Sequence, residues 1–488
     1  MSPTEPAVIA AYLAILVAVS LFLSRGRHAA ADYLVGRHDM PTWAICLSIV
    51  ATETSTLTVI SVPGVAYGHG MVFVGLGAGY IIGRAVVAWI LLPLYMRQGM
   101  TSAYQYLGQR FGRTMQRLAA GAFLLTRLLA EGVRLFASTL PICALLAAAH
   151  LPAGQLPVLL GLTLLTALYT SIGGLRAVVW SDSIQFGVYA LGAAFCVAIL
   201  LPRSAGGTLD AAPLHAAWQA GRFALFTHGS AILSAPYAPL TALVGGAILS
   251  MASHGADQLM VQRVLAARSL RAARLAMVGS AVVVTLLFGV LSAIGVLLWI
   301  RRAGATPAAL GLASPDGLFP AFIAHDVPPM LAGLLVAGIV GATMGSLSSA
   351  LNAMTGSTLS DLLPSSMTQG PSVVALSRAI TAAWAMLLVV AASCFSSTSQ
   401  SVVIFGLSIA GYSYGALLGA FLFGMLVPGA RPRDALAAFL GTLVIMAVLI
   451  LMHPGGHAIA FPWLVPIGVA TMLAIGTMSR LMPGRSCA

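Results

Sequence analysis

The chain has 488 residues, of which 59% are hydrophobic and only 7% are charged. A soluble domain is on average about 25% charged, so this composition excludes a soluble enzyme, and the high apolar content excludes a disordered chain. The formal charge of +12 comes from arginines scattered between apolar runs. That pattern is typical of membrane proteins and lacks the single basic face that nucleic-acid binding needs. The sequence therefore predicts a protein whose solvent is the lipid bilayer.

Thirteen runs of the chain are long and apolar enough to be membrane-spanning helices, each of which needs about 20 mostly apolar residues. Short loops join them, and no stretch has the composition of a soluble domain. We expect one all-α polytopic membrane domain over residues 1–488. The predicted spans are 7–23, 43–67, 71–96, 118–149, 155–171, 177–201, 231–252, 273–300, 328–351, 376–395, 402–427, 435–452 and 461–478.

The flanking charges predict how the chain is oriented. Glu5 precedes the first run, and Arg25 and Arg27 follow it. This order is the reverse of a cleaved signal peptide, so we expect a retained helix in the inner (plasma) membrane, with the N-terminus outside. Thirteen spans then place most loop arginines and the C-terminus in the cytoplasm. The five cysteines have no metal-like spacing, and we expect no disulfide framework and no cofactor.

A polar hexapeptide, residues 51–56 (ATETST), interrupts the second apolar run. Its hydroxyls point all round a helix, so they cannot share one buried face, and they compete with the helical backbone for hydrogen bonds. Two interpretations stay open. The stretch is either a locally unwound helix that binds a cation such as Na⁺ through its oxygens, or a polar interface with neighbouring helices.

A second stripe of small and polar residues lies in the stretch 341–352 (GATMGSLSSALN). Spacing of three and four residues places Ala342, Gly345, Ser346 and Ser349 on one helical face. Such a face suits either close helix packing or an ion site built from neutral hydroxyls.

Ionisable side chains within the predicted spans are functional candidates because they are costly in a bilayer. Arg127, Glu131 and Arg134 have the spacing that lets one carboxylate meet both guanidinium groups, and we interpret them as a self-satisfied structural cluster. Arg84 either neutralises a carboxylate substrate or forms an ion pair with Glu53 or Asp182, among other structural roles.

Four motifs together resemble the sodium/solute symporter family. The stretches 63–67 (PGVAY), 169–182 (YTSIGGLRAVVWSD) and 257–263 (DQLMVQR) resemble the first core helix, the YTxxGGLxAVxxTD stretch and the DQxxxQR loop of that family. The stripe through Ser346 and Asn352 resembles its sodium helix. The motifs occur in the family order, and thirteen helices is the usual number.

The resemblance implies a LeuT-type core of two five-helix inverted repeats with flanking helices. In such folds the first helix of each repeat is discontinuous and carries ion and substrate contacts near the middle of the membrane. For the second repeat we expect this discontinuity at Gly245–Gly246. The repeats and flanking helices cover about 43–201, about 231–427, 7–23, 435–452 and 461–478.

The resemblance also implies a sodium site made of three backbone carbonyls and one hydroxyl, those of Ala51, Thr54, Ala342 and Ser346. Gly345 stands where the family usually has a second hydroxyl, so one ligand is missing.

A further ion or coupling site is implied by other matched positions. Asp182, Ser348 and Ser349 match an aspartate and serines that hold another sodium in some sialic-acid relatives, and Glu53 matches an aspartate that proline symporters need for sodium coupling.

The expected substrate cavity is lined by residues of the first core helix and of the helix 71–96. Gly77 replaces a glutamate of the sugar-carrying members, which argues against a sugar, and Arg84 favours a small organic anion such as a carboxylate. The cavity candidates are Thr56, Thr58, Gly77, Tyr80 and Arg84.

The predicted function is symport of a small organic solute with Na⁺ into the cytoplasm by alternating access. Two alternatives stay open: a proton-coupled symporter in which Glu53 titrates, and an uncoupled facilitator of the same fold. The expected partners are the substrate, Na⁺ and the bilayer. The sequence does not specify the substrate, the ion stoichiometry or the oligomeric state.

Overall fold

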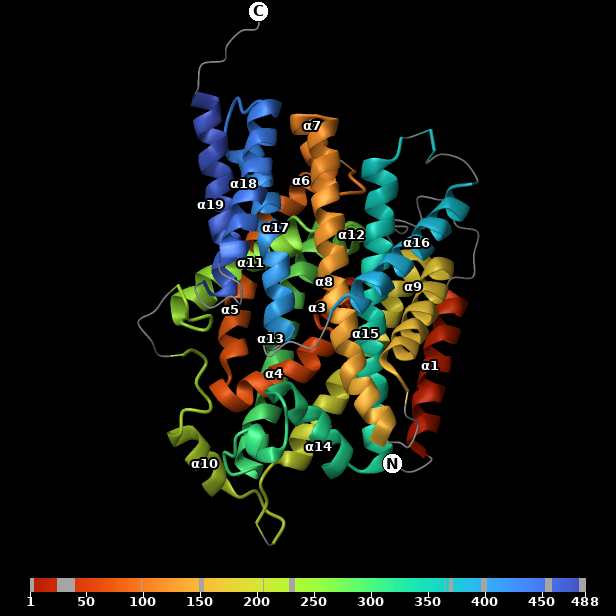
Figure 1. The fold of residues 1–488 in the computed structure, drawn as a ribbon, viewed down its shortest axis with the longest axis vertical. Coiled ribbons are helices and arrows are strands. Elements are labelled where there is room, and N and C mark those ends of the chain that lie inside the picture. Colours follow the sequence, from red (N-terminus) through yellow and green to blue (C-terminus); the bar gives the residue numbers. More distant parts are fainter. Residues whose placement is uncertain are drawn as a thin grey trace, which may run out of the picture.

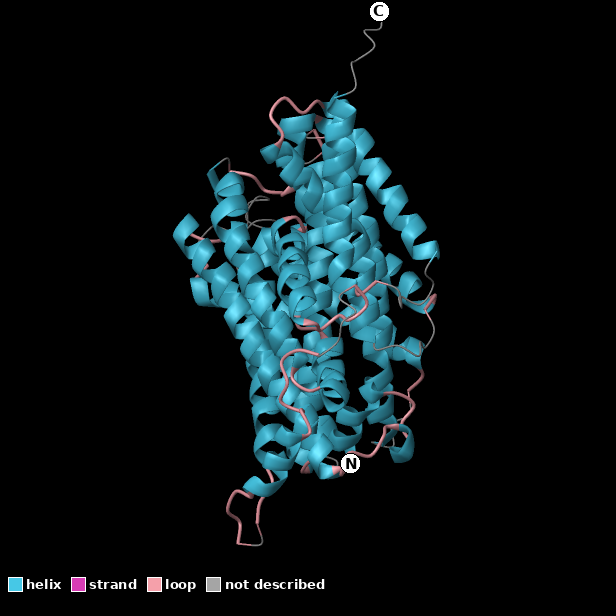
Figure 2. Cartoon of the chain, turned by 90° about the vertical axis from the view of Figure 1, so that its left-hand side faces the viewer, coloured by secondary structure: helices cyan, strands magenta, loops and turns pink. Residues whose placement is uncertain are grey.

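The computed structural model describes residues 4–23, 40–97, 99–148, 153–204, 206–227, 233–364, 366–367, 372–395, 402–452 and 459–481. Nearly all of the ordered elements in these ranges are helices, and most of them run along the longest axis of the molecule (Figure 1). Figure 2 shows the same bundle from the side, with loops mainly at its two ends and across its waist. The expected all-helical fold is confirmed.

The helices of the N-terminal half comprise one interrupted pair, several long spans and short connecting helices. They are α1 (Thr4–Leu23), α3 (Thr42–Glu53), α4 (Thr56–His69), α5 (Val72–Val86), η1 (Val87–Leu91), α6 (Leu92–Arg97), α7 (Tyr104–Phe111), α8 (Arg113–Ala148), α9 (Gln155–Leu200) and α10 (Ala211–Gln219).

The C-terminal half contains a second interrupted helix and six long helices. Its elements are η2 (Thr241–Gly245), α11 (Gly246–Gly255), α12 (Gln258–Leu265), α13 (Leu270–Arg301), η3 (Ala308–Leu310), η4 (Pro315–Gly317), α14 (Leu318–Asp326), α15 (Pro329–Ser357), η5 (Thr358–Leu362), α16 (Val373–Ser393), α17 (Val402–Leu426), α18 (Pro432–Met452) and α19 (Phe461–Leu481).

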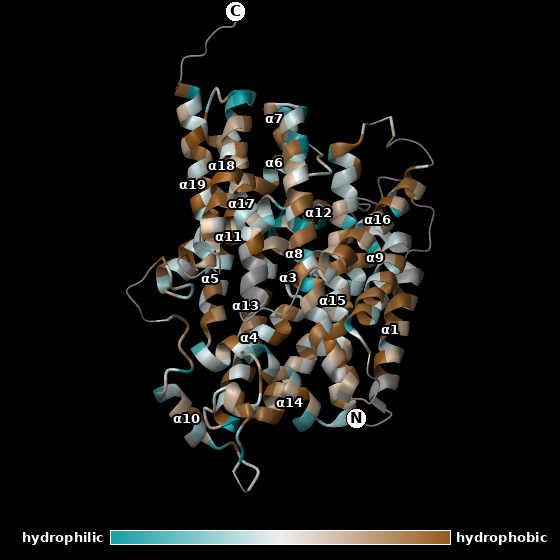
Figure 3. Ribbon diagram, viewed as in Figure 1, coloured by the Kyte–Doolittle hydropathy of each residue, from teal (hydrophilic) through white to brown (hydrophobic). Residues whose placement is uncertain are grey.

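The outer surface of the bundle is apolar, as a lipid-facing surface must be. Large hydrophobic side chains such as Leu164, Leu286 and Met386 are exposed, and brown, hydrophobic ribbon covers much of the molecule in Figure 3. Within the described residues, eight helices are long and apolar enough to cross a bilayer, or nine with the bent pair α3–α4. The chain is a multi-pass membrane protein, whereas thirteen crossings and the orientation stay predictions. Arg25 and Arg27 lie outside the described residues.

Two expected boundaries differ from the structure. The expected spans 155–171 and 177–201 are the two arms of α9, Gln155–Ser171 and Gly174–Leu200. The second arm begins earlier than expected, at a kink where Gly174 has a φ of +58° and a ψ of −164°. Because a side chain rarely adopts this positive φ, glycine permits the kink. The span expected to begin at 231 begins later, since residues 233–238 form turns and loop before the helix that contains η2.

The expected discontinuity at Gly245–Gly246 is wrong. Both glycines have helical backbone angles, and they instead allow close packing against Pro462 and Leu76. The break lies at Ala256–Asp257. There the Asp257 side chain accepts a hydrogen bond from the backbone N–H of Leu259 at 2.8 Å and begins α12 as its N-cap.

The crossing of α17 and α19 depends on glycine, because a Cβ at position 415 would lie 2.6 Å from Cα of Gly468. We expect Gly415→Leu to force the two helices apart and lower stability by about 1–3 kcal/mol. The measurement is the thermal unfolding midpoint in detergent. Gly161→Leu is the control, because Gly161 has no neighbouring atom within 4 Å of its Cβ position. Equal losses in the two variants would contradict the packing argument.

Candidate functional site

The polar hexapeptide interrupts a helix, as one of its two interpretations required. Helix α3 ends at Glu53, α4 begins at Thr56, and their axes are bent by 67°. Thr54 and Ser55 between them have extended backbone angles. The last turn of an α-helix leaves carbonyls without helical partners, so this break supplies backbone oxygens in the middle of the protein.

Helix α15 packs across the break through hydroxyl groups. The Thr56 hydroxyl donates to the backbone carbonyl of Ile339 at 2.8 Å and also meets the Thr343 hydroxyl. On the other side of the break, the hydroxyls of Thr52 and Ser349 are 3.1 Å apart. These two contacts flank both the break and Ser346.

Ser346 lies one turn from each flanking contact on α15, so its hydroxyl is on the face that packs against the break. This hydroxyl donates to the Thr343 carbonyl at 3.0 Å, which leaves its oxygen lone pairs as acceptors. Ala342 lies four residues before it on the same face. The structure thus brings the expected sodium-site residues of α15 to the interrupted helix that contains Ala51 and Thr54.

Gly345 lies on the side of α15 that packs against α9. A Cβ at this position would lie 2.3 Å from Oε1 of Gln185 and 3.2 Å from Oδ1 of Asp182. The side chains of α9 therefore fill the space that a serine at position 345 would need.

Asp182 is fully buried beside the same two helices, and an arginine neutralises it. Its Oδ2 accepts from the Ser48 hydroxyl at 2.6 Å and lies 3.5 Å from both the Arg263 guanidinium and the Ser349 hydroxyl. The Ser348 hydroxyl donates to its own helix at the Gly345 carbonyl. Sequence reasoning missed Ser48 and Arg263, although Arg263 ends the DQLMVQR motif.

Glu53 and Arg84 form an ion pair. Arg84 is fully buried, donates to the Ser280 hydroxyl at 2.7 Å and lies 5.9 Å from the centre of the Tyr80 ring. Its position fits the ion-pair interpretation and not direct contact with a substrate. The imidazole of His254 approaches the same carboxylate oxygen of Glu53, with Nε2 at 3.8 Å.

A cavity opens beside the α3–α4 break and extends to the α11–α12 break. Among the expected substrate residues, Thr58 and Tyr80 line it. Thr56 contacts α15 instead, and Gly77 packs against Thr285 of α13. The lining residues are Glu53, Ser55, Leu57, Thr58, Phe73, Tyr80, Arg127, Arg134, Leu249, Ser253, His254, Leu259, Met260, Phe288, Ala410 and Tyr414.

The Arg127–Glu131–Arg134 cluster forms one wall of this cavity. Glu131 Oε1 accepts from both arginines at 3.1 Å, as the spacing predicts. Arg127 also pairs with Asp257, whose carboxylate accepts from the Tyr414 hydroxyl at 2.5 Å. No local sequence pattern signals these long-range partners, because they come from the second break and from α17.

Arg134 is the arginine of this wall with spare hydrogen-bonding capacity. A guanidinium has five N–H donors, and among the described residues Glu131 alone receives a hydrogen bond from Arg134. Its side chain is 17% exposed, compared with 5% for Arg127. No group of three or more His, Cys, Asp or Glu side chains that could hold a metal occurs in the described part of the chain.

Two solved structures share this architecture. An outward-open, Na⁺-coupled sialic acid symporter superposes with a TM-score of 0.84 at 24% identity, and the alignment covers 99% of this chain and 98% of that one. Mhp1, a nucleobase-cation-symport-1 family transporter in a closed conformation, gives 0.56 at 12% identity over 92% and 93% of the two chains. The fold is that of a LeuT-type membrane transporter.

Residues 33–442 match the model of the sodium:solute symporter family, and the chain belongs to that family. It is therefore a transporter and not an enzyme. Na⁺-coupled solute symport is the activity that the family implies. The LeuT-type fold that the resemblance implied is confirmed, and the inverted repeats over 43–201 and 231–427 stay a proposal.

Several relatives with different substrates are about equally similar. The sodium/iodide cotransporter of Homo sapiens is 27% identical over 84% of this chain, which spans 64% of the length of that protein. The sodium/sialic acid symporter SiaT of Proteus mirabilis is 27% identical over 97% of this chain and 94% of its own length. The sodium-coupled monocarboxylate transporter 1 of Homo sapiens is 27% identical over 90% and 72%.

The Glu53–Arg84 pair predicts a stability effect. In Glu53→Gln the guanidinium of Arg84 stays buried without its counter-charge, and we expect a loss of about 3–5 kcal/mol, seen as a lower thermal unfolding midpoint in detergent. The double variant Glu53→Gln/Arg84→Met removes both charges and should recover much of that loss. A single variant as stable as the wild type would show that the pair does not stabilise the fold.

Proposed function

We propose that this protein carries a small organic anion into the cytoplasm together with Na⁺, by alternating access, with its N-terminus outside. The observation that carries the substrate part of this proposal is the position of Arg134. Its partly free guanidinium faces the cavity, and a guanidinium is suited to bind a carboxylate through two parallel hydrogen bonds. Arg134 thus takes the role that the sequence suggested for Arg84.

For the coupling ion we propose a site between the α3–α4 break and α15. The ligands are the backbone carbonyls of Ala51, Thr54 and Ala342 and the hydroxyl of Ser346. Unwound backbone carbonyls coordinate Na⁺ in transporters with interrupted helices. The flanking contacts, Thr52 with Ser349 and Thr56 with Thr343, support this position because they hold α15 against the break.

Charge balance gives a physical reason for coupling. The ionised groups around the cavity cancel, because Glu53 faces Arg84, while Glu131 and Asp257 balance Arg127 and Arg134. A monoanion alone would add an uncompensated charge to this desolvated space, which is unfavourable. A monoanion and one Na⁺ together add none. Each ligand therefore lowers the free energy of binding the other, and this reciprocity is the basis of coupling.

The same ion pairs argue against the alternatives. Arg84 already supplies the counter-charge of Glu53 from within the protein. The charge balance argues against an uncoupled facilitator, because an anion that enters without Na⁺ leaves a net charge in the cavity. We also propose Asp182 and Ser349 as a further coupling site. In this structure the counter-ion of Asp182 is Arg263.

We expect Na⁺ to raise the thermal unfolding midpoint of detergent-purified protein in a saturable way, relative to choline chloride at equal ionic strength. A ligand that binds only the folded state stabilises by about 2.7 kcal/mol at one hundred times its Kd. Ser346→Ala should reduce the effect strongly because it removes one ligand. Thr442→Ala in α18 is the matched control, since that buried hydroxyl donates to its own helix at the Ala438 carbonyl, away from α3 and α15. Equal Na⁺ responses in the two variants would exclude Ser346 from the site.

For the anion we expect Arg134→Gln to raise the KM of carboxylate uptake about tenfold or more, because a hydrogen bond to a charged group contributes about 1.5–3 kcal/mol. Uptake into proteoliposomes under a Na⁺ gradient measures this change. Arg134→Lys keeps the charge without the two-pronged geometry and should lie between the wild type and Arg134→Gln. An unchanged KM in Arg134→Gln would remove the arginine from the substrate site.

A further inference from the structure

An aromatic wall lies within the cavity. Phe73 and Tyr80 of α5 and Phe288 of α13 all line it. Phe288 packs edge-to-face on both partners, with ring centres 5.4 Å from Phe73 and 6.2 Å from Tyr80. These contacts fix the three rings as one apolar surface.

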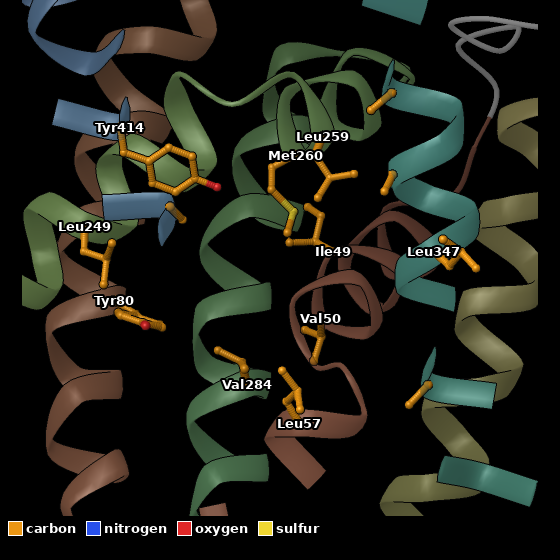
Figure 4. Close-up of a cluster of buried hydrophobic side chains, with 14 of the residues drawn as sticks. Ile49, Val50, Leu57, Tyr80, Leu249, Leu259, Met260, Val284, Leu347 and Tyr414 are labelled. Atoms are coloured by element: carbon orange, nitrogen blue, oxygen red, sulfur yellow. The ribbon is translucent and has the colours of Figure 1, made fainter. Parts of the chain in front are cut away.

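This wall and the arginine cluster belong to different parts of the bundle. Helix α5 packs on α11 and α13, whereas α8, which carries Arg134, packs on α15, α16 and α17. In Figure 4, Tyr80 and Leu249 lie on neighbouring helices, and the Tyr414 ring points toward Met260. A bound molecule therefore meets a guanidinium from one group of helices and aromatic rings from the other.

Most polar groups of the cavity already have partners within the protein. Glu53 binds Arg84, and the Tyr414 hydroxyl donates to Asp257. The Ser253 hydroxyl lies 2.8 Å from Nδ1 of His254. The remaining hydroxyls of the cavity are those of Ser55 and Thr58, on the interrupted helix near the proposed sodium site, and that of Tyr80 in the aromatic wall. Few groups are left to satisfy a substrate with many hydroxyls, and a desolvated hydroxyl without a partner is costly.

We propose that the substrate is an aryl monocarboxylate, whose carboxylate binds Arg134 and whose ring packs against Phe73, Tyr80 and Phe288. This assignment rests on the proposed function and narrows its substrate class. Aromatic rings prefer edge-to-face contacts with other rings, which the herringbone arrangement of this wall offers. The same cavity discriminates against sugar acids and sialic acid, because it offers few partners for their many hydroxyls.

The test uses the full-length purified protein with phenylacetate as the probe. In NaCl, phenylacetate should raise the thermal unfolding midpoint more than equal concentrations of phenylacetamide, gluconate, sialic acid or iodide. Phenylacetamide keeps the ring without the charge, gluconate keeps the carboxylate without the ring, and iodide is an anion with neither. In choline chloride the response to phenylacetate should be much smaller.

Two variants separate the ring contact from a general loss of structure. Phe288→Leu should weaken phenylacetate binding about tenfold while leaving the Na⁺ response intact. Phe322→Leu in α14, a buried ring outside the cavity, is the control and should leave phenylacetate binding unchanged. Equal weakening by both variants, or none by Phe288→Leu, would overturn the role of the wall.

The outcomes distinguish this inference from the proposed function. If gluconate or sialic acid stabilises the protein in a Na⁺- and Arg134-dependent way and phenylacetate does not, the aryl assignment is wrong while anion symport stands. If the panel and Na⁺ all fail to stabilise the protein, both the proposed function and this inference are wrong. Phenylacetate-driven stabilisation that persists in choline chloride would support the substrate class and contradict Na⁺ coupling.

Discussion

The fold depends on the need of every buried charge and every freed backbone group to find a partner inside the protein, because the bilayer offers none. Both helix breaks show this constraint. Glu53 ends α3 and pairs with Arg84 of α5, and Asp257 begins α12 and pairs with Arg127 of α8. In each case an ion pair between the carboxylate at the break and an arginine of a neighbouring helix holds the break against that helix.

Buried ion pairs also hold together the helices that form the candidate site. Asp182 of α9 binds Arg263 of α12 and reaches Ser48 and Ser349, so it connects α3, α12 and α15. The cavity lies between the two breaks, with cancelling charges around it. In our proposal such a site binds a cation and an anion together more tightly than either alone, which is the differential binding that coupled transport needs.

Local chemistry explains which sequence predictions succeeded. The hydroxyl-rich stretch 51–56 interrupts its helix because side chains compete with its backbone, and this signal is contained in six neighbouring residues. The prediction of a helix break at Gly245–Gly246 was wrong because glycine also allows close helix packing. Only the positions of Leu76 and Pro462 in the fold show that packing is the role of these two glycines. Arg84 likewise had two interpretations, and its distance from Glu53 along the chain could not decide between them.

The sequence by itself determined the membrane environment, the helical class, the family and the position of a candidate first break, because composition, hydrophobic length and short motifs are local properties. The tertiary structure alone decided the partners of the buried charges, the second break at Asp257, and the position of Arg134 at the same cavity as three aromatic rings. These features depend on contacts between helices far apart in sequence, such as α8 with α17 and α3 with α15. The residue pattern of one helix does not specify which neighbouring helix it packs against.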